Sequence, residues 1–143
     1  MVGLIVTGHG MFCTGMYEAM LSMTGKKDEV YSLNFHNNKT LGVYEEKLGI
    51  LVDDLLTRND SAIILTDLSE GPTFEVAIEV AAHYPNVGVV SSVNLNILLT
   101  MIATREVIKD PYELLNIALM DYQNLIVFYN NSAYSLKEDS KII

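Results

Sequence analysis

Apolar residues gather along the chain in five short runs that are rich in β-branched side chains. Runs of this length, bounded by polar and turn-forming residues, predict buried strands. The five runs cover residues 2–7, 30–35, 61–66, 87–91 and 125–129. We therefore expect the core of the protein to be built around strands at these places.

The segments between the runs carry apolar residues at spacings of three and four, which predicts helices with one buried face. A further helix is marked by its start, with Asp110 as N-cap, Pro111 at the first position and Glu113 at the third. The residues that share one face of the first four helices are Phe12, Met16, Ala19, Met20 and Met23; Leu41, Tyr44, Leu48, Leu51, Val52 and Leu55; Phe74, Ala77, Ile78 and Ala81; and Leu95, Leu98, Leu99 and Ile102.

Strands that alternate with helices predict an α/β protein with a mostly parallel sheet and helices on both faces. Such sheets bind ligands beyond the carboxyl ends of their strands. The polar residues that follow these ends are His9, His36, Asp67 and Asn94. We expect a functional site among them.

Composition limits the class of protein. A chain of 143 residues, half of them apolar, suits one domain with a sizeable core. It has no apolar run of the ~18 residues that a membrane span needs and no signal peptide pattern. The single cysteine, Cys13, cannot form an internal disulfide, which fits a reducing compartment. We therefore expect a cytoplasmic protein.

The net charge of −9 argues against a nucleic-acid partner, because phosphates recruit basic surfaces. An acidic surface permits a basic protein partner. Acidity also serves solubility, and charge by itself favours that simpler explanation.

The stretch Val6-Thr7-Gly8-His9-Gly10 joins the end of the first strand to the first helix. Glycines on both sides of His9 let the backbone bend and let a ligand approach closely. The unpaired N–H groups at the start of a helix favour an anion. A neutral imidazole beside such a turn is a candidate nucleophile toward phosphorus. Its second ring nitrogen needs an acceptor, and Asp67 supplies one if the first and third strands are neighbours.

Other readings of this stretch stay open. A single histidine at a strand end is more often a surface or capping residue than a nucleophile. Gly8, Gly10 and Gly15 resemble a dinucleotide loop, but their spacing differs from G-x-G-x-x-G. Cys13 lies one helical turn after His9, so a cysteine–histidine pair is conceivable, although a small buried thiol is commoner. The three histidines have no metal-ligand spacing, and we expect neither a metal nor a cofactor.

Three segments, in this order, resemble the IIA component of the mannose family of the bacterial sugar phosphotransferase system. They are the opening turn at residues 6–10, the loop after the third strand at 66–74, and the segment Ser92-Val93-Asn94-Leu95-Asn96. Each segment follows the carboxyl end of a strand. The resemblance covers roughly residues 1–130.

This resemblance implies that His9 accepts a phosphoryl group from HPr and passes it to a IIB component, which phosphorylates sugar entering through a membrane permease. The aspartate that matches Asp67 orients the imidazole. The implied fold is a doubly wound, four-stranded parallel sheet with a C-terminal antiparallel edge strand that packs across a homodimer. Residues 125–129 fit that edge strand, which gives a domain over residues 1–131 and a polar tail over 132–143.

Several residues are candidates to contact the phosphoryl group in this reading. Gly10 and the backbone amides after it would cradle the group, and Thr7 would add a hydroxyl. In the loop after the third strand the candidates are Ser69, Gly71 and Thr73.

The loop after the third strand also departs from the family pattern. Pro72 stands where a serine is usual and Thr73 where a proline is usual, so Ser69 or Thr73 would have to replace the missing hydroxyl. Glu70 and Glu75 add charges that would repel a dianionic phosphohistidine by up to a few kcal/mol. We expect both to face outward, or the transfer potential to be altered.

Three other functions remain as alternatives to a sugar phosphocarrier. The nearest is the phosphoryl-accepting subunit of dihydroxyacetone kinase, which shares the fold and a histidine after the first strand. A second is a non-catalytic regulator that binds partners without transferring phosphoryl groups. A dinucleotide-binding domain comes last.

Overall fold

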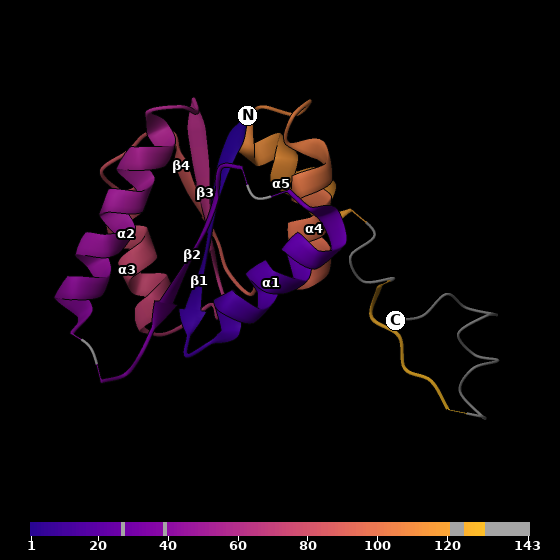
Figure 1. Cartoon of the computed structure of the whole chain (residues 1–143), viewed down its shortest axis with the longest axis horizontal. Coiled ribbons are helices and arrows are strands. Elements are labelled where there is room, and N and C mark those ends of the chain that lie inside the picture. Colours follow the sequence, from indigo (N-terminus) through magenta and orange to yellow (C-terminus); the bar gives the residue numbers. More distant parts are fainter. Residues whose placement is uncertain (27, 39, 121–124, 131–143) are drawn as a thin grey trace.

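The computed structural model describes residues 1–26, 28–38, 40–120 and 125–130 (Figure 1). Strands and helices alternate along the described chain until the last two helices, as the apolar pattern predicts. The elements are β1 (Val2–His9), α1 (Phe12–Thr24), β2 (Val30–Phe35), α2 (Leu41–Leu56), β3 (Ser61–Thr66), α3 (Pro72–Ala81), β4 (Val87–Val90), α4 (Leu95–Thr104) and α5 (Pro111–Leu119). The α/β prediction is confirmed.

The four strands form one parallel sheet in the order β2-β1-β3-β4. The chain leaves β1 for β2 on one side and then crosses back to β3 on the other, so the sheet is doubly wound. Thr7 pairs with both Leu33 and Thr66, which aligns the carboxyl ends of the three strands. The boundary between β1 and β3 is the point where the strand order reverses, and ligands of such sheets bind there.

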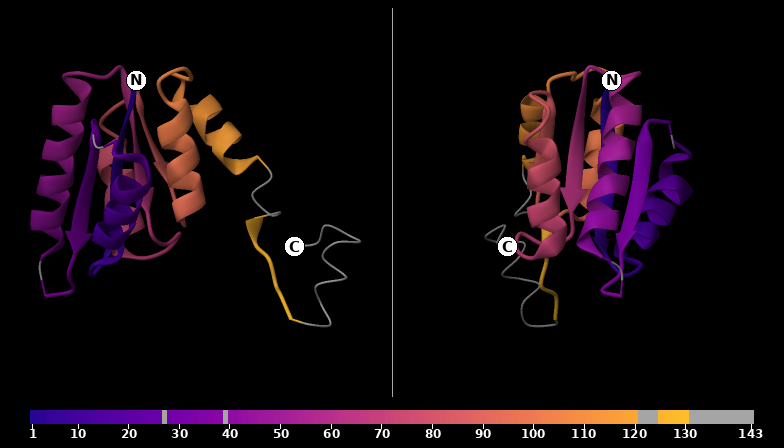
Figure 2. Two further views of the ribbon diagram at one scale, coloured as in Figure 1. Left: turned by 45° about the vertical axis from the view of Figure 1, so that its right-hand side comes forward. Right: turned by 90° about the vertical axis from the view of Figure 1, so that its left-hand side faces the viewer.

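Helices cover both faces of the sheet, with α1, α4 and α5 on one face and α2 and α3 on the other (Figures 1 and 2). Neighbouring residues of β1 point to opposite faces of the sheet. Leu4 and Val6 therefore pack under α1, α4 and α5, while Ile5 packs under α2 and α3. Both faces are therefore apolar, which explains why the strands read as continuous apolar runs in the sequence.

Three of the helices begin directly after a residue whose side chain caps them. Thr40 caps α2, Asn94 caps α4 and Asp110 caps α5, each by accepting a hydrogen bond from a backbone N–H of the first turn. The predicted N-cap at Asp110 is confirmed. In contrast, α1 begins after Met11 and α3 after Gly71 without a side-chain cap.

The expected edge strand is absent from the sheet in the described part of the chain. Residues 126–130 form no ladder, and Leu125, Val127 and Phe128 are 51%, 46% and 65% exposed. A strand needs a neighbouring backbone to pair with, and a sequence with high β-propensity does not supply one. Pairing with a second copy stays a prediction. The boundary proposed between residues 131 and 132 lies outside the described residues.

Candidate functional site

His9 and Asp67 meet at the carboxyl end of the sheet. His9 is the last residue of β1, and Asp67 directly follows β3, its neighbour in the sheet. The backbone N–H of His9 donates to Asp67 Oδ2 at 2.8 Å, and the ring atom Nδ1 lies 2.9 Å from the same oxygen. The two side chains are 33% and 9% exposed. The strand order therefore joins two residues that are 58 positions apart in the chain.

This contact decides which ring nitrogen of a neutral His9 is nucleophilic. An ionised carboxylate only accepts hydrogen bonds, so Nδ1 carries the proton and donates it to Oδ2. Nε2 then keeps its lone pair. The ring is partly exposed, so a reactant can approach it from solvent.

Asp67 is held ionised by its donors. Burial raises the pKa of this carboxyl. The hydrogen bonds from the His9 backbone, the His9 ring and the Thr73 hydroxyl together lower the pKa by more than burial raises it, so the pKa lies below its usual value. Its second oxygen, Oδ1, accepts from Leu68 N–H and from Thr73 Oγ1, both at 2.9 Å. The carboxylate is thus charged and held at both oxygens.

The two glycines beside His9 have different roles. A Cβ on Gly8 would lie 2.8–2.9 Å from side-chain atoms of Asp67, so Gly8 makes room for the carboxylate. Gly10 has a φ of +58° and turns the chain into α1. Its N–H donates to the carbonyl of Phe35 at 2.8 Å. The sequence predicted that this N–H would donate to a phosphoryl group, but in the structure it already has a hydrogen-bond partner.

Aromatic rings support the imidazole from the side of β2. The His9 ring stands edge-on to Phe35 with centroids 5.6 Å apart, and Phe35 contacts the buried Tyr44 ring of α2 at 5.0 Å. Burial raises the pKa of Tyr44 to about 12, so its hydroxyl stays protonated. These supports were not predicted from the sequence, although Phe35 ends β2 as His9 ends β1 and the two residues are paired.

The sequence predicts that the Thr7 hydroxyl contacts a phosphoryl group, and the structure places this hydroxyl in the interior. Its side chain is fully buried, donates to the Leu33 carbonyl at 2.7 Å and lies 2.6 Å from the Tyr44 hydroxyl. Since Thr7 uses its own proton on Leu33, Tyr44 is the donor to Thr7. Both contacts engage the Thr7 hydroxyl inside the protein, between β2 and α2.

The loop residues proposed to contact a phosphoryl group are spread around Asp67. Ser69 is exposed, and Gly71 is the residue that precedes α3, with a φ of +92°. Thr73 is fully buried and directs its hydroxyl to Asp67. The structure therefore brings Thr73 into the site as a partner of the aspartate.

The remaining strand-end and histidine candidates lie outside the His9–Asp67 pair. His36 is exposed in the turn after β2. Asn94 uses its side chain to cap α4 by accepting from Ile97 N–H. His83 follows the last turn of α3, whereas Asp67 precedes the first.

Cys13 does not pair with His9. Its buried thiol donates to Asn34 Oδ1 at 2.6 Å, and burial raises its pKa to about 11. A protonated, buried thiol is a poor nucleophile.

Over the described residues, no three His, Cys, Asp or Glu side chains are grouped so that they could hold a metal ion. Over the same residues, no helix has both the length and the apolar character of a membrane span.

The two helices that begin beside the pair are those without a side-chain cap, α1 and α3. The first N–H groups of a helix have no intrahelical partner and carry partial positive charge. An anion held near Nε2 would be stabilised by such helix starts. The site thus combines a nucleophilic ring nitrogen, an orienting carboxylate and an environment that favours an anion.

Comparisons with known proteins identify the family of the chain. Residues 3–118 match the family model EIIA-man, described as the fructose IIA component of the phosphotransferase system. A similar protein is the fructose-specific EIIA component of the phosphotransferase system of Bacillus subtilis (strain 168), 24% identical over 127 residues, or 89% of this chain and 86% of the relative.

Solved structures show the same fold. The IIA protein associated with the fucose utilization operon of Streptococcus pneumoniae has a TM-score of 0.76 at 24% identity, covering 93% of this chain and 95% of that one. The mannose/sorbose specific IIA subunit of Enterococcus faecalis has a TM-score of 0.77 at 19% identity, covering 90% and 95%.

Proposed function

The chain belongs to the EIIA-man family of phosphotransferase system IIA components, and on this premise we propose that it is a cytoplasmic phosphocarrier working through a phosphohistidine at His9. It accepts the phosphoryl group from phosphorylated HPr and passes it to a IIB component, which serves a sugar permease. Asp67 orients the ring. The observation that carries the proposal is the 2.9 Å contact between His9 Nδ1 and Asp67 Oδ2, which leaves Nε2 as the nucleophile.

In the proposed step, the Nε2 lone pair attacks the phosphorus of the incoming phosphohistidine. A new N–P bond forms as the N–P bond to the HPr imidazole breaks, and the electron pair of that bond returns to the departing ring. The proton stays on His9 Nδ1, so the His9 ring becomes cationic and is stabilised by the Asp67 carboxylate. Transfer to IIB reverses these events. Positioning and charge stabilisation supply most of such catalysis.

The test is the intact mass of the protein after incubation with phosphorylated HPr. We expect the gain of one acid-labile phosphoryl group in the wild type and none in His9→Ala. His36→Ala and His83→Ala are matched controls, because both histidines are exposed and lie outside the pair; both variants should still be labelled. Labelling of His9→Ala at the wild-type level would refute the assignment.

A second assay separates the proposed function from its rivals. The phosphorylated protein is mixed in turn with a IIB component and with the acceptor subunit of a dihydroxyacetone kinase. Loss of the label to IIB supports the sugar phosphotransferase function. Loss only to the kinase subunit would make the chain part of that kinase, and failure of the wild type to take up a label would favour a regulator.

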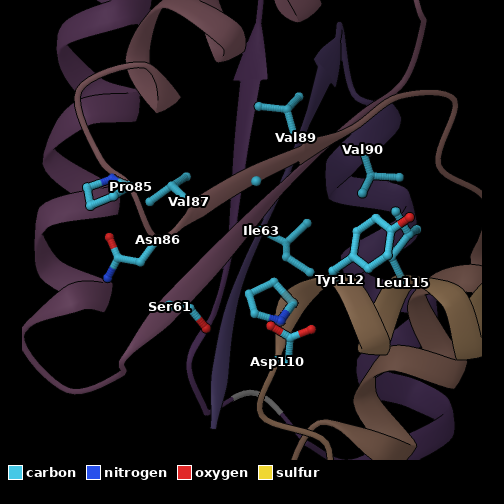
Figure 3. A pocket seen from close by; sticks show the side chains of 12 residues that line it. Ser61, Ile63, Pro85, Asn86, Val87, Val89, Val90, Asp110, Tyr112 and Leu115 are labelled. Carbon is cyan, nitrogen blue, oxygen red and sulfur yellow. The ribbon is translucent and has the colours of Figure 1, made fainter.

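We also propose that two copies associate along β4. Among the strands of the described residues, β4 has β3 as a neighbour on one side only. Beside it lies a groove of about 610 Å³ that contains Ile63, Val89 and Leu115 (Figure 3). The hydroxyl of Ser61 in the groove is buried and has no hydrogen-bond partner within the described chain. An edge strand beside apolar surface favours association with another strand.

Residues 125–129 of a second copy suit this groove, because the five apolar side chains are all 46–65% exposed in the single chain. Light scattering at micromolar concentration should give a dimer. Phe128→Lys should shift it toward the monomer. Val107→Lys, at a position 80% exposed between α4 and α5, introduces the same charge as a control and should remain dimeric. A wild-type monomer would contradict this association.

A further inference from the structure

Thr73 donates a hydrogen bond to Asp67, the residue that contacts the His9 ring. Thr73 is the second residue of α3, it is fully buried, and its hydroxyl donates to Asp67 Oδ1 at 2.9 Å. Oδ1 is the carboxylate oxygen that does not contact His9. Thr73 therefore acts on the opposite side of the carboxylate from the imidazole.

The four hydrogen bonds of Asp67 divide evenly between its oxygens. Both bonds to Oδ2 come from His9, and the two to Oδ1 come from Leu68 N–H and Thr73. Leu68 is the next residue in the chain, so its bond stays largely within the same loop. Thr73 belongs to α3, so its bond ties the carboxylate to a separate rigid element.

The orientation of a carboxylate depends on such partners, because the terminal torsion of an aspartate side chain is soft. If the plane of Asp67 turns or tilts, Oδ2 withdraws from His9 Nδ1. The ring then loses the acceptor that keeps the proton on Nδ1, and the tautomer protonated at Nε2 becomes populated. A ring protonated at Nε2 has no lone pair for phosphorus at that atom.

We propose that Thr73 is a positioning residue for phosphoryl transfer: it holds the Asp67 carboxylate so that Oδ2 stays on His9 Nδ1 and Nε2 stays free to react. The inference rests on the proposed phosphocarrier function of His9. Gly8 provides the space in which this orientation fits, since a Cβ there would overlap Asp67. Thr73 provides the side-chain donor that maintains it.

The experiment measures the His9 tautomer by ¹⁵N NMR of the unphosphorylated protein, together with the rate of phosphoryl uptake from HPr. Thr73→Val keeps the branched shape and removes the hydroxyl. We expect a larger fraction of rings protonated at Nε2 and uptake slowed by about 10- to 100-fold, the range for a small misplacement of a reacting group. Thr73→Ser retains the donor and should restore both values.

Thr104→Val on α4 is the matched control, because it removes a hydroxyl that donates to the Thr100 carbonyl of its own helix. It should change neither the tautomer nor the rate. If Thr73→Val does not fold, Thr73→Ala provides the same comparison. A wild-type tautomer ratio and rate without the Thr73 hydroxyl would overturn the positioning role. If the wild type accepts no phosphoryl group, the proposed function fails, while the tautomer comparison still decides the role of Thr73.

Discussion

Substitution of Gly8 by alanine should separate the fold of this protein from its chemistry. The φ of Gly8 is not among the positive values that Gly10, Gly25 and Gly71 adopt, so the backbone can accept an alanine. The added Cβ, however, would lie 2.8 Å from Asp67 Cγ and 2.9 Å from Oδ2. The Asp67 side chain must therefore move.

The size of the movement follows from ordinary contact distances. Two carbon atoms pack at ~3.5–4.0 Å, so the carboxylate must withdraw by roughly 0.7 Å or more. A bond of 2.9 Å between His9 Nδ1 and Oδ2 would then lengthen to about 3.6 Å, which is too long for a hydrogen bond. Overpacking of this kind costs ~1–3 kcal/mol of stability. Misplacement of the orienting group should slow transfer by about 10²-fold.

The assay is the rate of phosphoryl uptake from HPr, measured with the thermal stability of the same variant. Gly15→Ala is the control, because a Cβ at that exposed helical glycine meets no atom within 4 Å. It should leave uptake unchanged and stabilise α1 by up to about 1 kcal/mol. If Gly8→Ala takes up phosphoryl groups as fast as the wild type, the argument that Asp67 must sit against Gly8 is wrong.

Further predictions concern charge. Asp67→Asn should keep the fold and slow uptake by about two orders of magnitude or more, because an amide does not stabilise the cationic ring; an unchanged rate would remove the orienting role. Since the pKa of Asp67 is lowered in the folded protein, its contribution to stability is complete above about pH 4 and is lost as the pH falls through the folded pKa. Thermal unfolding of the wild type and Asp67→Asn should therefore differ less at low pH than at neutral pH. Glu70 and Glu75 are exposed beside the site, and a basic patch on HPr would be drawn to them. Uptake should slow as salt rises, and Glu70→Gln combined with Glu75→Gln should flatten this dependence; equal salt sensitivity would leave the acids only a helix-dipole role.

Residues 1–120 illustrate what the sequence by itself determined. The first four apolar runs are the four strands, and the Asp110-Pro111 start of α5 lies where the capping pattern predicts it. These features depend on neighbours in the chain, since periodicity and capping are local properties. The pairing of His9 with Asp67 was also predicted, because it needed only the assumption that the first and third strands are adjacent.

Tertiary structure decided the contacts that no local pattern specifies. Thr7 and Thr73 were both candidates to bind a phosphoryl group, yet one bonds Leu33 in the core and the other bonds Asp67. Gly8 adjoins Asp67, and the His9 ring is supported by Phe35. Each of these contacts joins residues from different elements, so it is set by the packing of strands and helices. The run at 125–129 has the composition of a strand, but a strand also needs a backbone to pair with, and within the described residues this run joins no sheet.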